Sequence, residues 1–414
     1  METTESSLID YDEVLKDLGR TAPQNHLLLG NGFNLSLGIN TSYPNILKVM
    51  KKNNREYETV FHENFNLEEF IGQCKSVIPK EGNPYWEFMT RYFHNKVKLD
   101  FMKAVTEIVA TEIRNIYQEK NEGIYLLIKH FGSFFTLNYD PFLYQLLMTY
   151  KKDNNEQALV FQDSLPGIEM YMDDESREIF DVIKRAHESG VLSINVSEQT
   201  RRLDLGKLSK TDFRKEVTLY LKERYPAKEI NRAVEVFWRT KNAENPKVIE
   251  NLDDGFGLFG SDLTFSSSRT QNLFFLHGAF HLYRRGESIH KITQESDKAL
   301  YEKIEEIVES QVLELVCVLS DSGKVEEIVN NEYLRSCLSR LAQLEGTMVI
   351  IGSSLATNDS HIFDQINRSR LQTVYISSSV NTESKDLEKA TQVFPNKRVV
   401  LFDRETITYL RATE

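Results

Sequence analysis

Apolar residues gather along this chain in short runs and in longer helical stripes. Short β-rich runs occupy residues 26–29, 131–137 and 273–276, and later ones read LELVCVL, GTMVIIGSSL, LQTVYIS and RVVLF. Strands that recur between helical stretches, several of them apolar throughout, predict an α/β fold with a mainly parallel sheet covered on both faces. One helical stripe repeats every three or four residues and predicts a buried helix face. Its members are Trp86, Met89, Phe93, Val97, Phe101, Val105 and Ile108.

The middle of the chain differs from both ends. Residues 151–269 contain long charged stretches such as DESREIFDVIKRAHE and KEINRAVEVFWRT, so we expect a large, mostly helical insertion there. Near its end, glycines and serines in DDGFGLFGSDLTFSSSRTQ predict a cluster of loops. The expected organisation is a lead over residues 1–20, an α/β domain formed by residues 20–150 and 270–414, and the insertion between its two parts.

Composition narrows the class of protein. No apolar stretch approaches the roughly 20 residues of a membrane helix, and the acidic start METTESSLIDYDEVLKDLG lacks a secretory signal. Cys74, Cys317 and Cys337 are scattered, so neither a disulfide framework nor a zinc site is expected. These observations favour a reduced, cytoplasmic protein without a metal.

The charge of the chain limits the kinds of partner it is expected to bind. A net charge of −12 and a pI near 5.4 argue against direct binding of nucleic acid by the whole surface. Residues 201–241 have a local excess of basic side chains. That excess indicates either a solvated helical face or a contact with an acidic partner.

Four of the predicted strands end in polar or glycine residues. Ligands of open α/β sheets bind outside the carboxyl ends of the strands, so neighbouring parallel strands would bring these four ends together. The ends are Gly30-Asn31-Gly32-Phe33-Asn34, Asn138-Tyr139-Asp140, His277-Gly278 and Gly352-Ser353-Ser354.

Each of these strand ends has both a functional and a structural interpretation. Gly30 and Gly32 before a helix offer amide groups to a phosphate, but Leu35 breaks the full G-x-G-x-x-G pattern and an ordinary turn is an alternative. Asn138 or Asp140 could cap the helix that begins near residue 141. His277 could be a hydrogen-bonded core histidine. Gly352-Ser353-Ser354 could be an ordinary strand-to-helix turn, with Asp359 or Ser360 capping the next helix.

In this order, the motifs GNGFN (30–34), FFTLNYD (134–140), LFFLHG (273–278) and IIGSSL (350–355) resemble the sirtuin-like superfamily. The closer similarity is to its bacterial NADases, and LHGAFHLYRRG and GSSLATNDSHI are similar to one bacterial branch. The resemblance implies a Rossmann-like domain that binds and cleaves NAD. Two departures from sirtuin deacylases count against protein deacylation: the Cys-x-x-Cys pairs of their structural zinc are missing, and Leu137 replaces a glutamine.

The resemblance also implies roles for individual residues. His277 would act as a general base, and Asn138 would orient water or the ribose hydroxyls. Asp140 would hold the nicotinamide end or orient Asn138. The remaining residues would contact the pyrophosphate and the riboses of NAD. They are Gly30, Asn31, Gly32, Phe33, Asn34, Tyr139, Gly352, Ser353, Ser354 and Asp359.

The predicted activity is therefore NAD glycohydrolysis, with NAD as substrate and without a metal. By resemblance the protein would be an effector of bacterial antiviral defence that is inactive until it assembles. The assembly would be a homo-oligomer, a complex with a sensor from a neighbouring gene (an ATPase or a nucleotide-sensing enzyme), or both. The alternatives are a sensor or scaffold that binds NAD or ADP-ribose without turnover, a sirtuin-type deacylase or ADP-ribosyltransferase, and a dehydrogenase.

Overall fold

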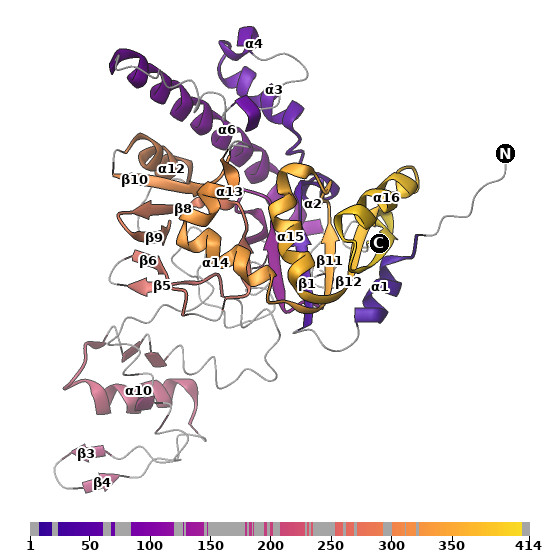
Figure 1. Cartoon of the computed structure of the whole chain (residues 1–414). Helices are drawn as coiled ribbons and strands as arrows, with labels where there is room; N and C mark the ends of the chain where they lie inside the picture. Colours follow the sequence, from indigo (N-terminus) through magenta and orange to yellow (C-terminus); the bar gives the residue numbers. More distant parts are fainter. Residues whose placement is uncertain are drawn as a thin grey trace.

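The structure is a computed structural model of the whole chain (Figure 1). It describes residues 8–18, 24–60, 68–70, 84–119, 127, 130–144, 147, 179, 182–183, 185, 194–196, 199–201, 208–227, 230–231, 233–234, 253–259, 262–268, 271–292, 300–310, 312–319 and 323–407.

Six parallel strands form the main sheet, in the order β13-β12-β11-β1-β2-β7. Their bounds are β1 Asn25–Leu29, β2 Ser133–Thr136, β7 Leu273–Phe275, β11 Glu345–Ile351, β12 Arg370–Ser378 and β13 Arg398–Asp403. All five residues of β1 are buried, as expected for a parallel strand that is covered on both faces. The predicted α/β, Rossmann-like, mainly parallel sheet is confirmed.

The strand order reverses at β1. From β1 the sheet grows through β2 and β7 on one side, and through β11, β12 and β13 on the other. In sheets of this kind the ligand crevice lies at such a reversal, outside the carboxyl ends of the strands. The ends of β1, β2, β7 and β11 lie along one edge because these four strands are parallel neighbours.

Helices flank the main sheet (Figure 1). The helices over residues 11–119 are α1 Tyr11–Leu18, α2 Asn31–Ser36, α3 Tyr43–Asn53, α4 Tyr57–Val60 and α6 Pro84–Glu119. Those over residues 300–406 are α12 Leu300–Glu309, α13 Lys324–Asn330, α14 Glu332–Leu341, α15 Ser360–Arg368 and α16 Glu383–Val393, with 3-10 turns η4 Thr357–Asp359 and η5 Arg404–Thr406. In the predicted lead, Ile9 bridges to Phe402 and α1 packs near β13, so residues 8–18 belong to the α/β body.

A second, antiparallel sheet adjoins the first, in the order β10-β8-β9-β6-β5. Its strands are β5 Phe256–Phe259, β6 Asp262–Phe265, β8 Gly278–Arg285, β9 Ser288–Lys291 and β10 Leu313–Cys317. The chain leaves the main sheet at the end of β7 and enters this sheet at Gly278, where the sequence predicted the end of a strand. The run LELVCVL forms a strand, as predicted, but this strand is β10 and belongs to the second sheet.

The predicted loop cluster near residue 260 was wrong. Its residues form the β5–β6 hairpin, and β6 pairs with β9, so the antiparallel sheet begins before residue 270. The rings of Phe256 and Phe265 pack against Tyr333, with centroids 5.4 and 5.1 Å away. The prediction gave weight to the glycines and serines of this stretch and overlooked the aromatic residues between them.

Before the β5–β6 hairpin, the elements described within the insertion are one helix and a further hairpin. They are α10 Lys210–Leu221, β3 Ile194–Val196 and β4 Gln199–Arg201. A small core forms around α10, separate from the main core. Its buried members are Ile179, Ile183, Phe213, Val217, Leu221, Ile230, Ala233 and Val234. The stretch YKKDNNEQ, which the sequence predicts to be a loop, lies outside the described residues.

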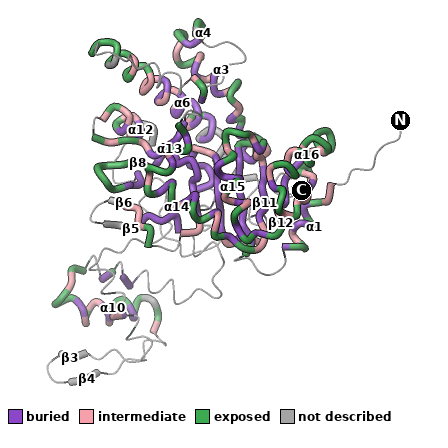
Figure 2. Tube along the Cα trace, in the orientation of Figure 1, coloured by how far each residue is buried: buried purple, intermediate pink, exposed green. Residues whose placement is uncertain are grey.

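Three of the seven residues in the helical stripe predicted to be core are exposed. Val97, Phe101 and Val105 of α6 are buried, whereas Trp86 and Met89 are 64% and 55% exposed. The 36 residues of α6 span about 54 Å at 1.5 Å per residue. The helix therefore extends beyond the two sheets, and its first half projects from the body (Figures 1 and 2). Helical spacing revealed the apolar face but not what covers it.

Candidate active site

The four polar strand ends meet at one pocket of about 510 Å³. Its walls come from the turns after β1, β2, β7 and β11, together with α3, α6, α13 and Glu68. Eleven of the thirteen residues singled out in the sequence line it. They are Gly30, Asn31, Gly32, Asn138, Tyr139, Asp140, His277, Gly352, Ser353, Ser354 and Asp359. The remaining two, Phe33 and Asn34, are buried beneath the wall.

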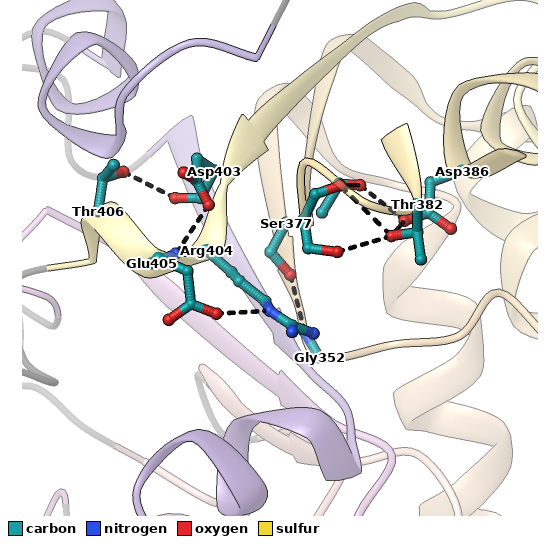
Figure 3. Close-up of polar contacts among 10 residues, drawn as sticks. Gly352, Ser377, Thr382, Asp386, Asp403, Arg404, Glu405 and Thr406 are labelled. Carbon is teal, nitrogen blue, oxygen red and sulfur yellow. Dashed lines mark hydrogen bonds and ion pairs between the residues drawn. The ribbon is translucent and has the colours of Figure 1, made fainter. Parts of the chain in front are cut away.

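Three glycines lock the turns after β1 and β11 together. The Gly30 amide donates to the Ile351 carbonyl at 2.9 Å, and the Gly32 amide donates to the Gly352 carbonyl at 2.8 Å. A Cβ added to Gly32 would lie 2.6 Å from the Gly352 Cα, and Gly352 itself has φ +72°. The Gly352 amide donates to the Ser377 hydroxyl of β12 at 3.1 Å (Figure 3).

This interlock corrects the predicted role of the first glycine turn. The sequence suggested that amides of Gly30 and Gly32 would receive a phosphate, but both amides already donate to carbonyl groups of the β11 turn. At these two glycines the pocket wall is therefore backbone without side chains.

A chain of amide and carboxylate groups fixes Asn138. Its Nδ2 lies 3.2 Å from the Asn34 Oδ1 and 3.4 Å from the Gly30 carbonyl. Asn34 in turn donates to Asp140 at 3.0 Å. Because the amide nitrogen of Asn138 serves these two acceptors, its amide oxygen is the group left for a ligand. Asn34 thus acts through Asn138. The side chain of Phe33 packs on Phe142, with ring centroids 6.0 Å apart.

Asp140 has a structural role as well as a place in the pocket. Its Oδ1 accepts the Phe142 amide at 2.9 Å, so it caps the turn after β2, as one interpretation of the sequence proposed. Burial raises the pKa of this carboxyl, and the hydrogen bonds from Phe142 and Asn34 offset part of that effect. Of the two functional roles predicted for Asp140, the contacts favour orientation of Asn138 through Asn34.

One ring nitrogen of His277 is hydrogen-bonded, and the other has no hydrogen-bond partner among the described residues. The side chain is 2% exposed, and Nδ1 lies 3.3 Å from the Leu137 carbonyl. Burial lowers the pKa of His277 well below 6.5, and the nearby charges of Lys324 and His361 lower it further. The neutral ring therefore donates from Nδ1, and Nε2 keeps its lone pair. Among the described residues, Nε2 has no hydrogen-bond partner, which is unusual for a core histidine.

Lys324 and Asp359 form an ion pair in the wall opposite Nε2. The Lys324 Nζ lies 2.9 Å from the Asp359 Oδ1, and the lysine is 4% exposed. The same carboxylate oxygen lies 3.5 Å from the Nε2 of His277. Because the imidazole is neutral, this approach is not an ion pair. Sequence reasoning missed Lys324, since a lysine at the start of an ordinary charged helix carries no signal.

Glu68 is a second residue that the sequence did not reveal. Its carboxylate accepts hydrogen bonds from Tyr139, at 3.0 Å, and from Tyr43. The Tyr139 ring lies 5.9 Å from the His277 ring and stacks on Phe280 at 6.4 Å. Burial and the Glu68 charge raise the pKa of Tyr139 well above 10, so its hydroxyl stays a donor. Glu68 lies in an acidic stretch far from the other motifs, and only folding brings it here.

The described residues hold no group of three or more His, Cys, Asp or Glu side chains suited to a metal. Cys317 and Cys337 are buried, and burial raises the pKa of Cys337 to about 12. Cys74 lies outside the described residues. Among the described helices, none is long and apolar enough to cross a membrane.

Comparison with known proteins adds one finding. A family described as a domain of unknown function, DUF4917, matches residues 207–407, just under half of the chain. No curated protein matches the sequence. The matched segment contains His277, Gly352 and Asp359, whereas the glycine turn after β1 and Asn138 lie outside it.

Proposed function

We propose that this protein cleaves NAD to nicotinamide and ADP-ribose. The observation that carries the proposal is the state of His277. This residue is a neutral imidazole whose Nδ1 is committed to Leu137, and its Nε2 has no partner among the described residues. It lines the same pocket as Asn138, at the reversal point of a Rossmann-like sheet. A pocket of about 510 Å³ falls within the usual range for cofactor-sized ligands.

The chemistry needs a base more than an acid. When the bond from ribose C1′ to the nicotinamide nitrogen breaks, its electron pair returns to the ring, and nicotinamide leaves as a neutral molecule. The ribose passes through an oxocarbenium-like state, as in glycoside hydrolysis. Water then bonds to C1′ and gives its proton to the Nε2 of His277. The amide oxygen of Asn138 would orient that water or a ribose hydroxyl.

The pocket also offers groups for the rest of NAD. Lys324 is a buried cation that suits a pyrophosphate, and Ser353 and Ser354 line the same wall. The surfaces of Gly30, Gly32 and Gly352 allow close approach to the backbone. Two aromatic rings, Tyr139 and Phe280, provide an apolar surface for a planar base.

We further propose that assembly gates this activity, as expected of a defence effector. The Nε2 of His277 is buried in this state, so NAD must displace part of the wall formed by Asp359 and Lys324 before reaching it. The partner would be a second copy of the chain or a sensor from a neighbouring gene, such as an ATPase or a nucleotide-sensing enzyme. Direct binding of nucleic acid is not expected, given the net charge of −12.

The direct test incubates NAD with the purified chain, alone and with the product of the neighbouring gene under triggering conditions. Chromatography should show nicotinamide and ADP-ribose in equal amounts. Tight NAD binding by calorimetry without nicotinamide release, in every assembly state, would contradict the enzyme and favour the sensor.

Replacing Asn138 with alanine should lower the cleavage rate about 10- to 1000-fold, because an oriented amide oxygen is lost while the base remains. Steady-state rates of nicotinamide release measure the effect. The control is Asn53→Ala, an exposed asparagine on α3, which should keep full activity. Equal rates for the two variants would remove Asn138 from the mechanism, and melting curves exclude unfolding as the cause.

A further inference from the structure

The first half of α6 carries a stripe of large apolar side chains that face solvent. We call this set the aromatic stripe. Its members are Tyr85, Trp86, Phe88, Met89, Tyr92 and Phe93, which are 40% to 81% exposed. Contiguous apolar patches of this kind mark interaction sites on water-soluble surfaces. Figure 2 shows this part of α6 largely exposed where it projects from the body.

A groove lies directly beside the stripe, between α6, the end of α12 and the start of β10. Its volume is about 630 Å³, and Phe88, Tyr92, Leu99 and Leu313 contribute its apolar surface. Charged residues of both signs also line it: Arg91, Lys96, Glu309 and Glu314. A protrusion and a groove therefore occur together on one chain.

We propose that a second copy of this chain occupies the groove, with the two α6 helices packed antiparallel about a twofold axis. Tyr85, Tyr92 and Leu99 are spaced by seven residues and lie on one side of the helix. Tyr85 and Tyr92 are exposed and would form the interhelical seam, whereas Leu99 is buried and lines the groove. In a twofold interface, residue i of one copy contacts residue j of the other, and the reverse contact follows. The Tyr85 end of each helix then enters the groove of the other copy.

The exposed area fits this occupant. A large aromatic residue has roughly 150–250 Å² of surface, so the six partly exposed side chains present on the order of 700 Å². A stable interface of standard size needs about 800 Å² from each partner. The groove carries both positive and negative side chains, so two identical surfaces can place opposite charges next to each other. This holds despite the overall net charge of −12.

The pairing also joins the proposed interface to the site. Phe101 and Val105, further along the same helix, line the candidate active-site pocket. A copy bound to the first half of α6 is therefore connected to the pocket by a continuous helix. The pairing itself does not depend on the proposed function, because it rests on the aromatic stripe and the groove beside it.

Light scattering coupled to size-exclusion chromatography of the full chain tests the pairing. The wild-type protein should elute as a dimer at micromolar concentration. Tyr92→Lys should weaken the dimer at least tenfold, since it places a charge in the centre of the seam. Leu387→Lys on α16, also an exposed apolar residue, should leave the dimer unchanged.

Disulfide crosslinking through a cysteine introduced at the seam provides a second measurement of the pairing. In a Cys74→Ser background, Met89→Cys should form an intermolecular disulfide under mild oxidation, whereas Leu387→Cys should not. A wild-type chain that stays monomeric, or a dimer indifferent to Tyr92→Lys and not crosslinked through Met89→Cys, would overturn the proposal. A monomer that floats with vesicles of phosphatidylcholine and phosphatidylglycerol would assign the stripe to a membrane surface and would overturn it as well.

Discussion

Replacing His277 with alanine is expected to lower the rate of NAD cleavage about 10²- to 10⁴-fold, the usual effect of removing a positioned acid–base group. The expectation follows from the ring nitrogens: Nδ1 is held by the Leu137 carbonyl, and Nε2 keeps a lone pair at the pocket wall. Without the imidazole, the pocket retains Asn138 and Lys324 but loses the neutral base that accepts the proton of water. Nicotinamide release by the assembled, triggered protein measures the loss.

A companion variant separates chemistry from folding. His277→Gln keeps a polar side chain of similar size in the same buried position, so it should fold but stay as inactive as the alanine variant. Thermal melting should place both variants close to the wild-type protein. Full activity of His277→Gln would exclude the base, and unfolding of both variants would show that the histidine serves the core instead.

The pH dependence offers a further check of the same residue. Burial, and then the Lys324 charge, lower the pKa of His277 well below 6.5, so the ring stays neutral through physiological pH. Cleavage should therefore stay constant as the pH falls from about 8 to 6, where an ordinary histidine base would already lose activity. Lys324→Met should raise the pKa of His277 by removing a like charge, and the acid limb should move to higher pH. An acid limb centred near 6.5 in the wild-type protein would contradict the buried, neutral imidazole.

The second large effect is expected from Gly352→Ala, which should destabilise the fold by roughly 2–5 kcal/mol through backbone strain and overlap combined. The backbone at Gly352 has φ +72°, and an added Cβ would lie 2.1 Å from the Phe33 amide nitrogen. The turns after β1 and β11 would have to separate, and the wall of the pocket would open. Urea denaturation of the two proteins gives the difference in the free energy of unfolding.

Gly38→Ala is a matched control for this substitution. Gly38 has a similar φ of +87°, but no heavy atom of the described residues lies within 4 Å of the position that a Cβ would take there. Gly38→Ala should therefore lower the free energy of unfolding only through backbone strain, by about 1–2 kcal/mol. Equal losses for the two variants would show that the contact between the two turns contributes nothing.

The sequence predicted the features that depend on local pattern and on a general rule of sheets. Apolar runs such as residues 26–29 predicted parallel strands, and the convergence of strand ends followed because ligand crevices lie outside the carboxyl ends. That reasoning placed His277, Asn138 and Gly352 at one pocket, where the structure has them. Their roles in NAD cleavage stay a prediction.

Other features depend on partners that a local pattern does not specify. Helical spacing identified an apolar face on α6, but it could not show that the face around Trp86 extends beyond the body. A glycine turn predicts free amides, yet the amides of Gly30 and Gly32 find carbonyls more than three hundred residues away. Glu68 and Lys324 look like ordinary surface charges until the chain folds around them.

The pairing of β1 with β11 has a consequence for how the protein is made. Leu27 lies opposite Val349, about 320 residues later in the chain. Translation at about 5–20 residues per second separates the two strands by roughly 16–64 s. During that interval the nascent chain exposes the apolar edge of β1, and the part of the pocket wall that follows β11 does not yet exist. If the protein destroys NAD, a ribosome-bound chain or one cut short before β11 is harmless to the cell that makes it.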